Sequence, residues 1–361
     1  MTLPRITLLT TLLLATPAVA QLQITPPATI PSPAPDKKAK EPPRDKPKVA
    51  PHTITKKKEP APKPSASPSP TLPATVIPAP ATDNSNVDLV FGAYQRGLYK
   101  TAFDLASERA KTGDAKAMTM LGELYSNAMG IRRDYAKAVE WYKRASDAGD
   151  REAMFALAMM RIAGRGGPVD KGEAVKLMAS AAKLGEPKAA YNLALLYLDG
   201  QTLPQDVKRS AELLRQAADA GLPEAQYALA TFYKEGTGVP KDPERSVRLL
   251  QAASLADNVD AEVEYAIAMF NGTGTPKNQP AAVALLRKAS RQGSAIAQNR
   301  LAWVLINGMG APVDKVEGFK WHLVAKTAGK GDPELDKQLA DLPAEDRAKA
   351  EAAAKKWLGN K

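Results

Sequence analysis

The stretch YNLALLYLDGQTLPQDVKRSAELLRQAADAG, from Tyr191 to Gly221, decides the fold of this chain. Apolar residues recur at helical spacing in both of its ends, and Gly200, Pro204 and Asp206 interrupt the pattern between them. A glycine after a helix supplies the left-handed conformation that ends it, and a proline blocks continuation. An aspartate then accepts hydrogen bonds from the free N–H groups of the next helix. The stretch therefore predicts a helix, a tight turn and a second helix.

This pattern returns 36 residues later as YALATFYKEGTGVPKDPERSVRLLQAASLAD and fills six consecutive units from Gly113 to Ala328. One column holds only small residues, which let two helices approach closely: Ala117, Ala153, Ala189, Ala225, Ala261 and Ala297. Another column supplies the predicted N-caps of the second helices: Asp134, Asp170, Asp206, Asp242, Asn278 and Asp314. A fixed period of this length is typical of repeat proteins. The sequence predicts an all-α fold, a right-handed α-solenoid of six helix-turn-helix repeats.

Two segments flank the predicted repeats. Residues 87–112 predict a capping helical hairpin at the N-terminal end, and residues 329–361 predict capping helices at the C-terminal end. Two positions within the repeats depart from their columns: Arg161 replaces a tyrosine, and Thr202 replaces the second glycine of a turn. Local looseness is expected at both positions.

The first twenty residues, MTLPRITLLTTLLLATPAVA, predict a secretory signal peptide. Arg5 precedes a short apolar run, and Ala18-Val19-Ala20 fits a cleavage site after Ala20. A membrane-spanning helix needs about 20 apolar residues, so an uncleaved anchor is the weaker interpretation and no stable membrane insertion is predicted. The predicted location is the periplasm, with secretion as the alternative.

Residues 21–86 form a segment of different composition, with 17 of the chain's 30 prolines. Proline lacks a backbone N–H donor, so this segment is predicted to be a disordered linker. Its basic residues predict an electrostatic tether to an anionic surface: Lys37, Lys38, Lys40, Lys56, Lys57 and Lys58. A solubilising spacer is the alternative. No nucleic-acid partner is predicted, because the basic run lacks aromatic residues on which bases could stack.

The sequence offers little catalytic chemistry. It has no cysteine and two histidines: His52 lies in the linker, and His322 falls in a column otherwise filled by Tyr142 and apolar residues. The glycine-rich turns recur with the repeat period, which indicates turns and not phosphate-binding loops. No catalytic site, metal site or cofactor is therefore predicted, and the chain is predicted not to be an enzyme.

The repeat LGELYSNAMGIRRDYAKAVEWYKRASDAGD, which starts at Leu121, resembles a Sel1-like repeat, a relative of the tetratricopeptide repeat. The resemblance covers all six units. It implies that the first helix of each unit lines the concave surface of the solenoid. Some periplasmic proteins of this family inhibit membrane sensor kinases, so the resemblance implies such a kinase as one kind of partner.

Two positions three residues apart share one face of each first helix and vary between units. Four of the six pairs are apolar and predict a partner-binding groove: Met159, Ile162, Leu195, Leu198, Ile267, Phe270, Trp303 and Ile306. The alternative is that these residues are ordinary core between repeats. The sequence leaves both interpretations open.

The predicted function is a scaffold or regulator in the bacterial cell envelope that holds a peptide or helix of an envelope protein. Two alternatives remain open, namely a cell-wall or glycan-associated structural factor tethered by the linker, and a secreted effector. The dependence of binding on salt concentration distinguishes these hypotheses. Added ions screen exposed charges and weaken electrostatic tethering, whereas binding by apolar burial persists.

Overall fold

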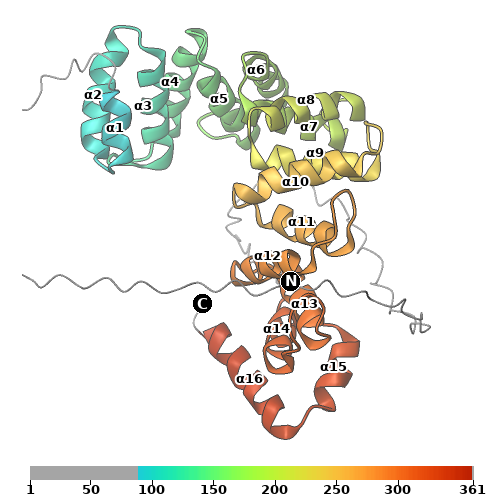
Figure 1. The fold of residues 1–361 in the computed structure, drawn as a ribbon. Coiled ribbons are helices and arrows are strands. Elements are labelled where there is room, and N and C mark those ends of the chain that lie inside the picture. The colour runs from blue at the N-terminus through green and yellow to red at the C-terminus, as the bar shows by residue number, and fades with distance from the viewer. Residues whose placement is uncertain (1–87, 360–361) are drawn as a thin grey trace, which may run out of the picture. The chain divides into compact units, whose positions relative to one another are not determined.

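The computed structural model describes residues 88–359, so the predicted signal peptide and linker lie outside the described residues. The described part is all helical (Figure 1). In chain order its helices are α1 (Leu89–Gln95), α2 (Tyr99–Lys111), α3 (Ala115–Asn127), α4 (Tyr135–Asp147), α5 (Arg151–Ala163), α6 (Lys171–Lys183), α7 (Pro187–Asp199), α8 (Val207–Asp219), α9 (Pro223–Glu235), α10 (Pro243–Leu255), α11 (Val259–Asn271), α12 (Gln279–Arg291), α13 (Ala295–Ile306), α14 (Lys315–Thr327), α15 (Pro333–Ala340) and α16 (Ala344–Gly359).

Helices α3 to α14 form six consecutive hairpins, so the predicted α-solenoid is confirmed. The odd-numbered helix of each hairpin is its first helix, and the even-numbered helix is its second. Each second helix packs against its own first helix and against the first helix of the next hairpin (Figure 1). Helices α1 and α2 pack in the same way before the first repeat, and α15 and α16 follow the last one.

Turn chemistry explains why every hairpin has the same form. The predicted N-cap side chains all accept a hydrogen bond from a backbone N–H at the start of the second helix. The first helices α5, α7, α9 and α11 end at a left-handed glycine. In the first repeat Ala128 takes that conformation, with φ of 59°. A non-glycine residue costs free energy there, so this turn departs from the favoured chemistry.

A second turn glycine fits against the preceding repeat. Gly238 has φ of 66°, and a Cβ there would lie 2.6 Å from the carbonyl oxygen of Val207 at the start of α8. Thr202 occupies the same position in the third repeat without a positive φ, so its turn follows a different backbone path. At the other departure, Arg161 forms a 2.8 Å ion pair with Glu173. The lost tyrosine is thus replaced by a charged contact within the hairpin.

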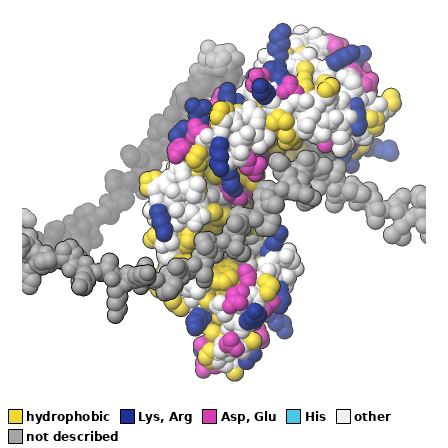
Figure 2. Space-filling view, turned by 90° about the vertical axis from the view of Figure 1, so that its right-hand side faces the viewer, with side chains coloured by type: hydrophobic (Ala, Val, Ile, Leu, Met, Phe, Trp, Pro, Cys, Tyr) yellow, Lys and Arg dark blue, Asp and Glu magenta, His cyan; other side chains and the backbone are white. Residues whose placement is uncertain are grey.

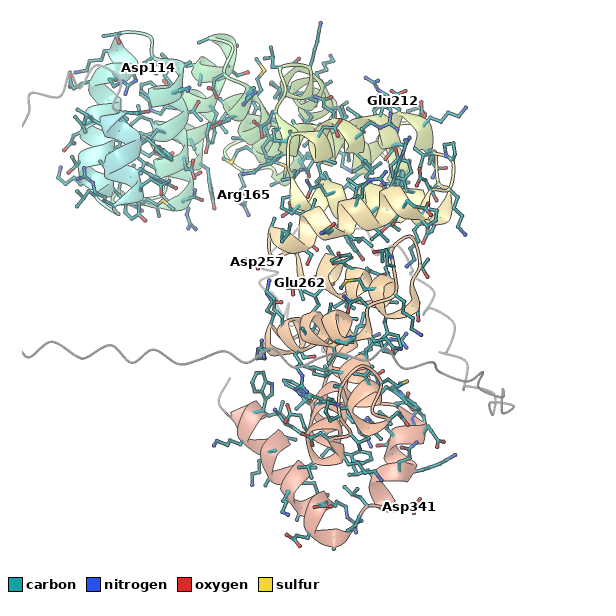
Figure 3. The ribbon with its side chains drawn as sticks, in the orientation of Figure 1. Asp114, Arg165, Glu212, Asp257, Glu262 and Asp341 are labelled. Carbon is teal, nitrogen blue, oxygen red and sulfur yellow. The ribbon has the colours of Figure 1, made fainter. Side chains whose placement is uncertain are left out.

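The fifth repeat opens with Asp257 in place of the usual glycine, with φ of 59°. Its carboxylate lies 2.7 Å from the Nζ of Lys288, which also lies 2.5 Å from Oε1 of the fully buried Glu262. Figure 3 shows Asp257 and Glu262 close together at the start of α11. Hydrogen bonds to these two carboxylates raise the pKa of Lys288. One lysine therefore ties α12 to the start of α11.

The core consists of small residues facing larger ones. The column of Ala117 and its equivalents is almost fully buried in all six repeats, as are Leu121, Leu157, Leu193, Leu229 and Leu301. His322 is also fully buried, and its Nε2 lies 2.8 Å from Oδ1 of Asp336 in α15. His322 is thus buried like the apolar residues of its column.

Candidate protein-binding face

The first helices carry the eight predicted groove residues, and the structure places these residues at different depths. Met159 in α5 is exposed, with 39% of its surface accessible. Five others are half-buried: Ile162, Leu195, Leu198, Ile267 and Trp303. Phe270 and Ile306 are buried in the core of the C-terminal repeats, with 8% and 6% accessible. The predicted stripe therefore contains both surface and core positions.

Helices α5 and α7 carry four of the six accessible members, Met159, Ile162, Leu195 and Leu198. Ile162 in α5 and Leu198 in α7 pack against the same buried cluster, which includes Leu193 and Leu229. Met159 and Leu195 lie one turn before them on the same helix faces. Ile162 and Leu198 therefore share an apolar base, and part of each of the four side chains remains accessible.

The sequence analysis missed a further column on these faces. Phe155 lies four residues before Met159, and Tyr191 lies four residues before Leu195, so each extends the stripe by one turn. Both rings are half-buried and pack against the same cluster as Ile162 and Leu198. Reading the 36-residue column one turn earlier would have found them. We call the resulting surface the apolar face and define it by Phe155, Met159, Ile162, Tyr191, Leu195 and Leu198.

Helix α9 interrupts the apolar character. At the two variable positions it carries Thr231 and Lys234, and Lys234 forms a 2.7 Å ion pair with Glu264 in α11. Tyr227 continues the aromatic column in α9 and is half-buried. Burial and the nearby Asp260, Glu264 and Glu235 raise its pKa, so the phenol stays neutral at physiological pH. The apolar face is thus bordered on this side by polar groups.

Tyr191 keeps its proton for a similar reason. Burial and the charge of Glu224 raise the pKa of its phenol. A neutral phenol presents an apolar ring together with one hydroxyl that can donate and accept a hydrogen bond. The apolar face therefore consists of aromatic rings and aliphatic side chains, and the Tyr191 hydroxyl is its polar side-chain group.

The C-terminal part of the predicted stripe is joined to the cap. The indole Nε1 of Trp303 donates a 2.9 Å hydrogen bond to Oδ2 of Asp332, the N-cap of α15. Ile267 packs against the cluster that contains Phe270 and Ile306. These contacts hold α11, α13 and α15 together and leave less apolar surface for a partner than α5 and α7 do.

Charges on the array are mixed. On the face drawn in Figure 2, Lys and Arg side chains alternate with Asp and Glu, and hydrophobic side chains lie in separate groups among them. Within residues 88–359 no group of three or more His, Asp or Glu side chains is arranged to hold a metal ion. None of the described helices has the length and hydropathy required to cross a bilayer.

Comparison with known proteins identifies the repeat. The family model described as Sel1 repeat matches six times, at residues 115–150, 151–186, 187–222, 223–258, 259–294 and 295–330. Each match begins where a first helix begins. No curated protein matches the chain.

Two solved structures show the same architecture. A protective antigen of uropathogenic Escherichia coli strains, which displays an SLR fold, is 27% identical with a TM-score of 0.63. The match covers 72% of this chain but only 56% of that antigen. A Sel1 repeat protein from Oxalobacter formigenes is 26% identical with a TM-score of 0.59, and the match covers 66% of this chain and 98% of that one.

Proteins built from this repeat are generally non-enzymatic scaffolds for protein–protein interaction. The repeated columns, the six helical hairpins and the six matches lead to one conclusion: the chain belongs to the Sel1 repeat family.

Proposed function

We propose that this protein is a non-enzymatic interaction scaffold of the bacterial cell envelope that binds an amphipathic helix or an extended peptide of an envelope protein on its apolar face. The observation that carries the proposal is the set of six partly accessible apolar side chains on α5 and α7, four of which pack against one buried cluster. Such a patch on a folded surface is typical of a binding site. The envelope location rests on the signal sequence expected in residues 1–20.

The apolar face suits an apolar anchor better than a charged one. Four of its six members pack against one buried cluster, and Lys234 and Glu264 form an ion pair at its border. A partner helix would place side chains at positions i, i+3, i+4 and i+7 against α5 and α7. Binding by apolar burial persists at high salt, whereas binding through exposed charges weakens.

The test is a capture experiment from envelope extract with the full chain as bait at low and high salt. Met159→Asp places a charge in the centre of the apolar face, and Thr231→Asp places the same charge in the same column of α9 as a matched control. We expect the wild type and T231D to retain the same envelope protein at high salt and M159D to lose it. A partner that M159D holds as tightly as the wild type contradicts the proposal.

A second set of variants tests the alternative of electrostatic tethering. Replacing the six tether lysines by glutamine removes the charge predicted to bind an anionic surface: Lys37, Lys38, Lys40, Lys56, Lys57 and Lys58. If capture needs these lysines and disappears as salt rises, the protein acts as a tethered cell-wall or glycan factor. The apolar face then has no part in that binding.

A further inference from the structure

A second, separate surface lies between the third and fourth repeats. A pocket of about 310 Å³ is formed by the second helices α8 and α10 and by the end of α9. Three arginines line it, with one tyrosine and one aspartate: Arg215, Arg245, Arg248, Tyr233 and Asp219. None of these residues belongs to the apolar face.

Tyr233 is the central polar group of this pocket. Only 5% of it is accessible, and its hydroxyl oxygen accepts hydrogen bonds from Nη2 of Arg215 at 3.2 Å and from Nη1 of Arg245 at 3.5 Å. Arginine has donors and no acceptor. No acceptor for the Tyr233 hydroxyl proton lies within hydrogen-bonding distance in the part of the chain that the structure describes. That proton is therefore free to bind an oxygen atom of a ligand.

The arginines leave positive charge unused. Arg245 also forms a 3.0 Å ion pair with Asp242, but neither Arg215 nor Arg248 has an ion pair within residues 88–359. Burial of the phenol raises the pKa of Tyr233, but hydrogen bonds and charge from Arg245 and Arg215 outweigh this and lower it overall. The guanidinium groups therefore favour negative charge at the position of the hydroxyl. Asp219 and Asp242 offset this field only in part, because three guanidinium groups face two carboxylates.

The equivalent positions at the other repeat junctions do not combine these groups. Each other junction has four residues at the positions of Arg215, Tyr233, Arg245 and Arg248, in that order. From the N-terminal junction to the C-terminal one they are Ser107, Tyr125, Lys137 and Glu140; Lys143, Arg161, Glu173 and Lys176; Ala179, Tyr197, Arg209 and Glu212; Gln251, Met269, Ala281 and Ala284; and Arg287, Leu305, Glu317 and Lys320. Each of these sets contains a carboxylate or lacks the tyrosine. The concentration of basic groups around a buried phenol is therefore a feature of one junction and not of the repeat.

We propose that Arg215, Tyr233, Arg245 and Arg248 bind an oxyanion group, either a phosphate or a carboxylate. Guanidinium groups bind both kinds of anion through paired N–H donors, and charge-assisted bonds of this kind are among the strongest in proteins. The Tyr233 hydroxyl donates to a further oxygen of the anion, and Arg248 supplies a guanidinium that no described carboxylate occupies. A ligand with two or three oxygens on one centre uses all of these donors at once.

The experiment is isothermal titration calorimetry on the full chain, with inorganic phosphate in one arm and succinate in the other, at ionic strength held constant with sodium chloride. We expect saturable binding of one equivalent in at least one arm, and the arm that binds more tightly identifies the group. Arg248→Gln is expected to weaken binding about tenfold, as loss of a hydrogen bond to a charged group does. Tyr233→Phe keeps the ring and all three charges, and it is expected to weaken binding by a smaller factor.

The matched control is Arg287→Gln. Arg287 lies in the column of Arg215, two repeats later, where Leu305 replaces the tyrosine. We expect this variant to bind as the wild type does, and urea midpoints confirm that each variant is folded. Absence of saturable binding in both arms, or equal affinity of the wild type, R248Q and Y233F, overturns the proposal.

Discussion

The N-terminal and C-terminal halves of the repeat array bury the same columns to different depths. In α5 and α7 the two variable positions of the first helix remain partly accessible, whereas in α11 and α13 the second of them is buried as Phe270 or Ile306. Gly318 in α14 explains part of the difference, because a Cβ there would lie 2.6 Å from Cγ1 of Ile306. Because α14 carries glycine at this position and so has no Cβ there, the Ile306 side chain has room to pack in the core. At Ile306, burial therefore depends on the residue that the neighbouring helix presents.

The largest expected effect tests this division by side-chain removal. Phe270→Ala is expected to lower the free energy of unfolding by about 3 kcal/mol or more, because it leaves a cavity in the C-terminal core. Ile162→Ala, at the equivalent position of α5, is expected to lower it by about 2 kcal/mol or less, because its side chain is only half-buried. Urea denaturation followed by circular dichroism measures both. Equal losses in the two variants would show that the halves do not differ in this way.

A glycine substitution sharpens the same comparison and is expected to have a smaller effect. Gly318→Ala places a methyl group against Ile306 and is expected to cost about 1–3 kcal/mol of stability. Gly172 in α6 lies in open space by comparison, since the nearest atom to a Cβ there is Oδ1 of Asp170 at 3.5 Å. Gly172→Ala is therefore expected to stabilise the protein by up to about 1 kcal/mol, as alanine favours a helix. Thermal unfolding of the two variants should shift in opposite directions, and a shared direction contradicts the packing argument.

The repeat period explains why the fold could be predicted so completely. Each hairpin contacts mainly its neighbours, so a column of the sequence corresponds to one environment in the structure. The N-cap aspartates and the left-handed glycines therefore appear where the pattern places them. Local turn chemistry is read from a few adjacent residues, and the N-caps confirm it in all six repeats.

The candidate sites were predicted less well because they depend on departures from the period. Phe270 and Ile162 occupy equivalent positions, but Phe270 is buried and Ile162 is half-buried, a difference that their shared column does not reveal. The pocket lined by Arg215, Arg245 and Arg248 joins α8, α9 and α10 across a repeat junction, and its lining residues lie up to 34 positions apart in the sequence. Arg161 also departs from its column, which otherwise holds tyrosine in several repeats. Its ion pair with Glu173 is a contact that the column alone does not predict.

The smallest expected effect concerns acid stability at the C-terminal end. Asp336 in α15 lies 2.8 Å from Nζ of Lys326 and 2.8 Å from Nε2 of His322, both in α14. The hydrogen bonds from Lys326 and His322 lower the pKa of this carboxyl group below its ordinary value of 3.8. Folding therefore favours the ionised form, so the contribution is present above pH 3.8 and is lost as the pH falls through the lower folded-state value.

Asp336→Asn removes this contribution at neutral pH. Because 37% of the Asp336 side chain is accessible, the loss is expected to be below about 1 kcal/mol. The difference in stability between the wild type and D336N should shrink from pH 7 to pH 3 in urea titrations. Asp341 ends the same helix, is exposed, and forms no ion pair among the described side chains, so Asp341→Asn is the control (Figure 3). If D341N loses as much stability as D336N at every pH, the carboxylate between α14 and α15 makes no specific contribution to the stability of the C-terminal end.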